Sequence, residues 1–264
     1  MPLVYAGPAP DAARLSRIAR APSQPGRYRT PDGRPCPGVT GLLADLGLGV
    51  EYPAWLSRER LDHLAARGQR VHQLTAMALA FSKGLTALPS HDDMRAAGAG
   101  DTEVNPFLAA AATWAAHRID LLDSCSPTRF RLEHAFVAED ARGRAAGGRV
   151  DLALGPVAAV RGTKLYLFDF KLYDLPARQG NPHALQLAGY AWGLRKALQL
   201  PPDCEVRRRI VSLRDDGSYR ELRYEQWANQ DDLTWRGALA GWYRRYRPDG
   251  TGGNDHGRYN VGGE

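Results

Sequence analysis

The sequence has few cysteines and lacks long apolar runs, and each shortage excludes a class of protein. Its three cysteines, Cys36, Cys125 and Cys204, stand far apart and form no Cys-x-x-Cys pair, so their spacing encodes neither a disulfide framework nor a zinc ribbon. No apolar stretch approaches the roughly 20 residues that a membrane-spanning helix needs. We therefore expect a soluble protein of a reducing compartment, with no membrane partner.

An ordinary globular composition accompanies an excess of positive charge. Hydrophobic residues make up 44% and charged residues 24%, and 264 residues suffice for one well-buried domain. The 35 lysines and arginines exceed the 29 acids and give a formal charge of +6, which suits a polyanionic partner without specifying one. Residues 11–29 are arginine-rich like a transit peptide, but Asp11 and the neighbouring prolines argue against targeting, so a cytoplasmic location is expected.

Helical periodicity dominates the first half of the chain. Residues 1–38 predict an irregular arm, residues 39–247 the main domain and residues 248–264 a glycine-rich tail. A short helix is expected over 40–46, with Thr40 as its cap, and a long one over about 53–81, where leucines recur at helical spacing. Gly68 interrupts the long helix at a cost of about 1 kcal/mol relative to alanine. A polar loop over 84–103 and a helix over 105–123 follow.

Three strands are predicted next, over 129–138, 148–154 and 164–173, because side chains there alternate. Strict alternation places Asp169 and Lys171 on one face of the third strand. In the first two strands it sets Phe130, Leu132, His134 and Phe136 on one face, and Arg149, Asp151 and Ala153 opposite Val150, Leu152 and Leu154.

The acids of the second and third strands predict a cation site. If these strands pair, Asp151 lies beside Asp169, and two adjacent carboxylates are relieved by a shared proton or a bound cation. Oxygen ligands of this kind favour Mg²⁺ or Mn²⁺ over zinc. The alternative is an ordinary Asp169–Lys171 ion pair, but this strand is apolar on both sides, and an unneeded charge in a central strand would be costly.

His72 lies one helical turn after Gly68. A single helical histidine is more often a surface or satisfied core residue than a metal ligand, so His72 by itself indicates little.

Taken together, these residues resemble a known family. Glu133, the run 148–151, Asp169-Phe170-Lys171 and the run 186–190 resemble the PD-(D/E)XK nuclease superfamily, in its RecB-like exonuclease branch. Upstream, residues 38–40, Trp55 and the run 67–72 resemble the start of the phage-type and mitochondrial genome-maintenance exonucleases of that branch. The likeness covers about residues 38–195.

The resemblance implies an α/β fold, a mixed central β-sheet flanked by α-helices with an N-terminal helical extension, and a Mg²⁺- or Mn²⁺-dependent DNA exonuclease of a bacterial or phage-infected cell. DNA ends or single strands would be its substrate, and a recombination or single-strand-binding protein a further partner. It implies these roles: Asp151, Asp169 and the Phe170 carbonyl as metal ligands, His72 and Glu133 as additional ligands, Lys171 acting on the attacking water, and Gln186, Tyr190 and Arg149 supporting the site or touching DNA.

The sequence departs from the family pattern in two places. Asp169 stands where glutamate is commoner, and three cysteines are too few for the iron–sulfur cluster of some members, so no cluster is expected. A structure-specific or restriction-like endonuclease remains an alternative, as does a non-catalytic nucleic-acid-binding or assembly protein. The central expectation is a single ion bounded by His72, Glu133, Asp151 and Asp169, from four separate elements.

The last part of the sequence predicts a helix over 181–199, a hairpin of 205–213 and 218–224, and an amphipathic helix over 230–247. Three successive arginines, Arg207 to Arg209, make the hairpin basic. They predict either a phosphate-contacting edge or a solvated face, and the sequence favours neither.

Overall fold

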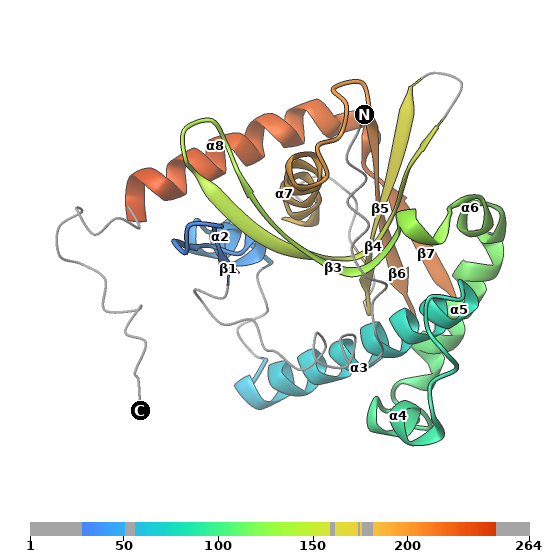
Figure 1. The fold of residues 1–264 in the computed structure, drawn as a ribbon. Helices are drawn as coiled ribbons and strands as arrows, with labels where there is room; N and C mark the ends of the chain where they lie inside the picture. The colour runs from blue at the N-terminus through green and yellow to red at the C-terminus, as the bar shows by residue number, and fades with distance from the viewer. Residues whose placement is uncertain (1–27, 51–55, 159–161, 174, 176–181, 247–264) are drawn as a thin grey trace.

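A mixed five-stranded sheet forms the centre of the protein (Figure 1). The computed structural model describes residues 28–50, 56–158, 162–173, 175 and 182–246. The strands lie in the order β3-β4-β5-β6-β7, and all neighbours are antiparallel except β5 and β6, which are parallel. Trp55, Asn181 and most of the predicted arm and tail lie outside the described residues.

The main sheet consists of β3 (Phe130–Glu139), β4 (Ala145–Ala158), β5 (Thr163–Lys171), β6 (Glu205–Leu213) and β7 (Tyr219–Arg223), and a small second sheet of β1 (Tyr28–Arg29) and β2 (Pro35–Cys36). The helices are α2 (Val39–Asp45), α3 (Arg58–Ser82), α4 (His91–Ala96), α5 (Asn105–His117), α6 (Ile119–Ser124), α7 (Pro182–Ala197) and α8 (Ala228–Tyr246). Among them, none combines the length and the apolar character required to cross a bilayer.

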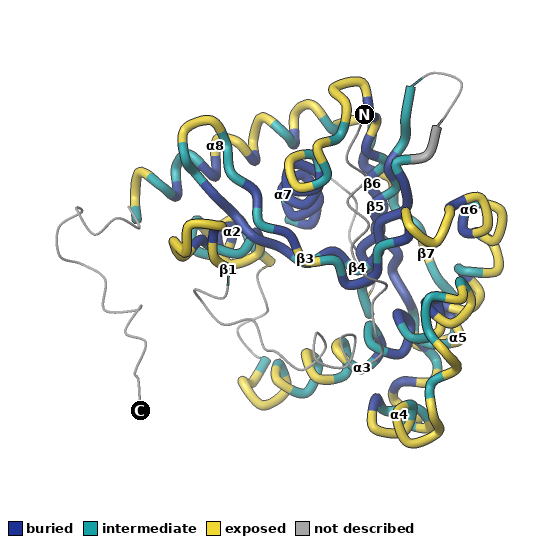
Figure 2. The backbone as a smooth tube through the Cα atoms, viewed as in Figure 1, coloured by how far each residue is buried: buried dark blue, intermediate teal, exposed yellow. Residues whose placement is uncertain are grey.

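Helices cover both faces of the sheet, and each face has its own hydrophobic core. On one face α2, α7 and α8 pack around Trp235, and on the other α3, α5 and α6 pack around Trp114. Figure 2 shows α7 buried along most of its length, whereas the first half of α3 is largely exposed. The predicted α/β fold, a mixed sheet flanked by helices, is therefore confirmed.

Three helix predictions need correction. Gly38 rather than Thr40 occupies the cap position of α2, and because glycine has no side chain, α2 begins without a side-chain capping hydrogen bond. The predicted loop over 84–103 contains the helix α4. Ser90 and Asp93 cap its N-terminus, because the side chain of each accepts a hydrogen bond from the backbone N–H of the other. The helix expected over 105–123 is two helices, because the backbone breaks at Arg118 between α5 and α6.

The strict alternation predicted for the first two strands is wrong. Phe130 and Leu132 pack in the core beneath α3 and α5, whereas Phe136 packs in the core beneath α7. In a regular strand all three side chains would lie on one face, because even numbers of residues separate them. Glu133 lies between them with a φ of 46°, a left-handed conformation that interrupts the pleat. In β4 the face changes beside Asp151, since Val150 packs beneath α7 and Leu152 beneath α3.

Candidate metal centre

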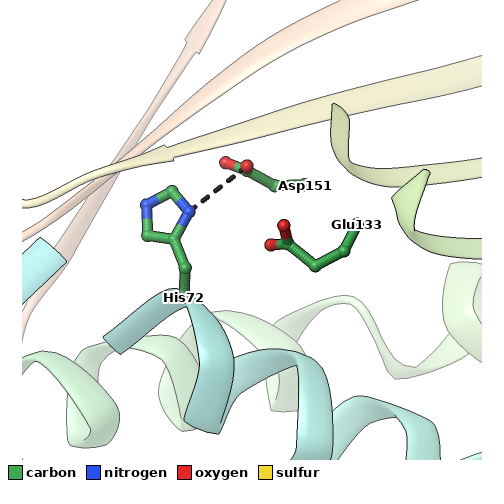
Figure 3. A group of neighbouring side chains, drawn as sticks. All are labelled: His72, Glu133 and Asp151. Carbon is green, nitrogen blue, oxygen red and sulfur yellow. Dashed lines mark ion pairs between the residues drawn. The ribbon is translucent and has the colours of Figure 1, made fainter. Parts of the chain in front are cut away.

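Three side chains from three separate elements meet between α3 and the sheet (Figure 3). His72 projects from α3, Glu133 from β3 and Asp151 from β4, and one ligand atom of each lies within 4.8 Å of the other two. Glu133 and Asp151 stand opposite each other, because the pairs Leu132–Leu152 and His134–Val150 flank them. The two irregular strand positions therefore carry the two acids of this group.

Asp151 also lies where β4 separates from β5. The last pair between these strands on this side is Leu152–Phe168, so Asp151 and Asp169 face each other one residue beyond it. The side chain of Asp151 replaces the missing strand partner, because its Oδ2 accepts a hydrogen bond from the Phe170 backbone N–H at 2.7 Å. Its Oδ1 lies 3.2 Å from Nδ1 of His72.

Asp169 is not a member of the group of three. Its Oδ2 lies 2.8 Å from Nζ of Lys171, and its side chain is 4% exposed. The pairing of β4 with β5 brings Asp151 and Asp169 together as predicted, but the expected ring of four side chains is a group of three beside an Asp169–Lys171 pair. The short aspartate arm and the adjacent ammonium account for this placement.

Burial and mutual charge perturb every ionisable group here. Burial alone would lower the pKa of His72, but the carboxylates of Asp151 and Glu133 raise it to about 9. Burial and then the Asp151 charge raise the pKa of Glu133 to about 7. Burial likewise raises the pKa of Asp169, whereas the cations of His72 and Lys171 lower that of Asp151 despite its burial. A divalent cation would relieve this crowding of carboxylates.

Lys171 carries a positive charge at neutral pH. Burial disfavours the ammonium, but the carboxylates of Asp169 and Asp151 outweigh it and raise the pKa of Lys171 above its ordinary value. Its side chain can therefore donate hydrogen bonds and stabilise negative charge.

Arg149 holds Glu133 in place. Its Nε lies 3.0 Å from Oε2 of Glu133, and Arg149 pairs with Ala135, two residues along β3 from Glu133. Since a non-glycine residue with positive φ costs about 1–2 kcal/mol, Glu133 keeps a strained backbone at the candidate site.

We expect the free energy of unfolding of Glu133→Gly to be about 1 kcal/mol higher than that of Glu133→Ala, because only glycine relieves the left-handed strain at this position. Urea denaturation of both variants measures the difference. A strand position with negative φ serves as control: Ala135→Gly should destabilise instead. Equal stability of Glu133→Gly and Glu133→Ala would show that the backbone there is unstrained.

Gln186 and Tyr190 lie on α7, next to a histidine and a tyrosine that sequence reasoning missed. The Gln186 Nε2 donates a hydrogen bond to the Tyr190 hydroxyl at 2.9 Å, and Oε1 of Gln186 lies 3.1 Å from Nδ1 of His183. Nε2 of His183 lies 2.7 Å from the hydroxyl of Tyr173. The spacing of His183 and Gln186, three residues apart on one helix, was the available signal.

Two of the three successive arginines of the hairpin, Arg208 and Arg209, are buried, in contrast to both predicted alternatives. Arg208 is 2% exposed and pairs with Asp232, and Arg209 is 7% exposed and pairs with Glu221 and Glu225. Arg207, at the start of the hairpin, pairs with Glu205. Acids of β7, α8 and the turn before α8 thus neutralise Arg208 and Arg209. A repeat of like charges in the sequence gives no indication of such partners.

A basic hollow lies at the far end of the β3–β4 hairpin. It has a volume of about 530 Å³ and is lined by Arg142, Arg144, Ala240, Tyr243 and Arg244. Asp140 holds Arg144 through its Oδ2 at 2.6 Å, whereas Arg142 and Arg244 extend to solvent. These residues come from a turn and a helix about 100 positions apart, so the sequence alone could not bring them together.

Comparison with known proteins leaves the family open. No family model matches the sequence, and no curated protein matches it. A crystal structure of a protein from Eubacterium rectale provisionally named an exonuclease is 9% identical, with a TM-score of 0.36 over 90% of this chain and 82% of the other. The crystal structure of SSO0001 is also 9% identical, with a TM-score of 0.29 over 73% of this chain and 95% of the other. At such identities and TM-scores, neither likeness decides the activity of this chain.

Proposed function

We propose that this protein is a metal-dependent nuclease of the PD-(D/E)XK type that hydrolyses phosphodiester bonds of DNA at ends or in single strands. The observation that supports it most is the meeting of His72, Glu133 and Asp151 where β4 leaves β5, beside the buried Asp169–Lys171 pair. A binding module would need only a basic surface and has no use for several buried carboxylates facing a phosphate. Two carboxylates and an imidazole suit Mn²⁺ at least as well as Mg²⁺.

Each group in the site has a role in this reaction. A divalent cation, when bound, would polarise the phosphodiester and lower the pKa of a water molecule. His72, Glu133 and Asp151 would hold it, with Asp169 and the Phe170 carbonyl, which follow on β5, as further donors. The ammonium of Lys171, fixed by Asp169, donates hydrogen bonds to a phosphate oxygen or to the attacking water and stabilises the negative charge that develops there.

The metal requirement and the substrate separate the three candidate functions. End-labelled linear DNA should be degraded with Mg²⁺ or Mn²⁺ and remain intact with EDTA, while closed circles survive. Nicking of closed circles would favour the endonuclease. Retention of DNA without cleavage under either metal would favour the non-catalytic binding protein and contradict the proposed function.

We propose the basic hollow as a second contact for the DNA backbone. Glu133 and Asp140, which pairs with Arg144 of the hollow, are seven residues apart, and seven residues of extended strand span about 23 Å. The centre lies on the α3 side of the sheet and the hollow beside α8 on the other side, so a nucleic acid that contacts both would pass around the edge strand β3. A recombination or single-strand-binding protein that delivers DNA in the cytoplasm is a compatible partner.

Arg142→Glu with Arg244→Glu is expected to raise the KM for DNA about tenfold or more and to leave kcat within twofold, since phosphate contacts position the substrate without reaching the reacting atoms. The slope of log KM against the logarithm of the salt concentration should also decrease, by the amount expected for the loss of about two phosphate contacts. Steady-state kinetics at several salt concentrations measure both. Arg220→Glu on β7, at the opposite edge of the sheet, is the control. A KM no different from that of this control would rule out the second contact.

A further inference from the structure

We propose that His183, together with Tyr173, is a positioning residue that fixes the direction of a largely buried hydrogen-bond chain and thereby directs the hydroxyl proton of Tyr190 toward the Asp169 carboxylate. The chain runs Tyr173–His183–Gln186–Tyr190, through distances of 2.7, 3.1 and 2.9 Å. Its value for catalysis rests on the proposed nuclease function, whereas its direction is a property of the folded protein.

The members of the chain share one face of α7 and the end of β5. His183, Gln186 and Tyr190 are three and four residues apart, so they project from the same side of the helix. Tyr173 follows β5 two residues after Lys171. His183, Gln186 and Tyr190 are 4%, 8% and 7% exposed, so each polar group on this face depends on protein partners.

The orientation of the Gln186 amide shows the direction of the chain. Its nitrogen donates to the Tyr190 hydroxyl, so its oxygen faces Nδ1 of His183, and an amide oxygen can only accept. Nδ1 of His183 must therefore carry a hydrogen. A neutral imidazole has only one such hydrogen, which leaves Nε2 bare to accept from the Tyr173 hydroxyl.

His183 is neutral at physiological pH, as this assignment requires. Its burial, and after it the positive charge of Lys171, lower the pKa of the ring to about 4. The tautomer is then the only variable, and the hydrogen bond on one ring nitrogen determines the role of the other.

The direction decides what Tyr190 offers to the site. Its oxygen is already an acceptor for Gln186, so its own proton remains available to a further acceptor. Burial and then the Asp169 carboxylate raise the pKa of Tyr190, so the hydroxyl stays protonated. With the opposite direction Tyr190 would donate to Gln186 and present only lone pairs to the Asp169–Lys171 pair.

Nitrogen NMR of the ¹⁵N-labelled full-length protein tests the direction without any activity measurement. Long-range ¹H–¹⁵N spectra, with His183→Asn to assign the signals, should show His183 protonated at Nδ1 and bare at Nε2. A hydrogen at Nε2, or an averaged mixture of both tautomers, would overturn the proposal. If the Nδ1–H tautomer is found but no DNA is cleaved under any metal, the proposed function fails and the direction of the chain stands.

Kinetics with DNA then test the positioning role. His183→Phe should lower kcat about tenfold, as for other residues that orient catalytic groups, and leave KM within twofold. His183→Asn, which keeps a donor near the position of Nδ1, should recover most of the loss. Trp192→Phe, a buried change on the same helix outside the chain, should leave kcat unchanged. A wild-type kcat in His183→Phe, or an equal loss in Trp192→Phe, would contradict the role.

Should His183→Phe fail to fold, Tyr173→Phe provides the same test, because it removes one hydroxyl from a side chain that is 41% exposed. A fall in kcat without a change in KM is expected. Unchanged kinetics in Tyr173→Phe would show that the chain does not act on the site.

Discussion

Replacing Asp151 by asparagine is expected to lower the rate of DNA hydrolysis more than about 100-fold, beyond the range observed for residues that only support metal ligands. Asparagine removes the negative charge that faces His72 and the candidate cation, but its oxygen can still accept the Phe170 N–H. The fold at the separation of β4 and β5 should therefore persist. Single-turnover hydrolysis with Mg²⁺ and with Mn²⁺ measures the rate, and fluorescence anisotropy in EDTA checks that DNA binding is retained.

Two controls make this result specific. Asp62→Asn removes an exposed carboxylate of α3 that pairs with Arg58, so its rate should equal that of the wild type. Lys171→Ala should abolish cleavage in the same way as Asp151→Asn, whereas Lys164→Ala, at the other end of β5, should not. Turnover close to wild type in Asp151→Asn or in a folded Lys171→Ala would show that the reaction takes place elsewhere.

Replacing Glu221 by glutamine is expected to lower the free energy of unfolding by about 3–5 kcal/mol, the usual cost of removing one partner of a buried ion pair. The Glu221 carboxylate accepts from Trp114 at 3.2 Å and from Arg118 at 2.9 Å, and it lies 3.2 Å from Arg209. Without its charge the buried Arg209 loses one of its two acids inside the protein.

The pair Arg207–Glu205 on the same hairpin is a matched control. Both side chains are about a third or more exposed, so Glu205→Gln should change stability by less than about 1 kcal/mol. Urea denaturation followed by circular dichroism measures both variants. If Glu221→Gln is no less stable than Glu205→Gln, the buried arginine network does not hold β6 and β7 to α5.

Periodicity was sufficient for the elements that carry the candidate site. The long helix that carries His72 and the strands that carry Glu133, Asp151 and Asp169 all exist. The pairing of β4 with β5, which the sequence argument assumed, is also present. The placement of Asp169 and Lys171 on one face of β5 was predictable because they are two residues apart, the period of a strand. Which residues bind a metal or contact DNA stays a prediction.

The features that could not be predicted from the sequence depend on the local backbone conformation and on residues far apart in the chain. The left-handed conformation of Glu133 breaks the alternation that sequence patterns assume, and it reverses which side chains face α3. The burial of Arg208 and Arg209 depends on acids of β7, α8 and the turn before α8, and the link between His183 and Tyr173 requires β5 beside α7. Such contacts follow from tertiary packing, which single-sequence periodicity does not encode.

The central claim is that one divalent cation binds among His72, Glu133 and Asp151, and a crystal soaked in Mn²⁺ tests it most directly. We predict a single strong anomalous peak about 2.0–2.3 Å from Nδ1 of His72 and from the Asp151 carboxylate, within reach of Glu133 and Asp169. A crystal of active protein with no peak there, or with its peak at a different set of ligands, would contradict the claim.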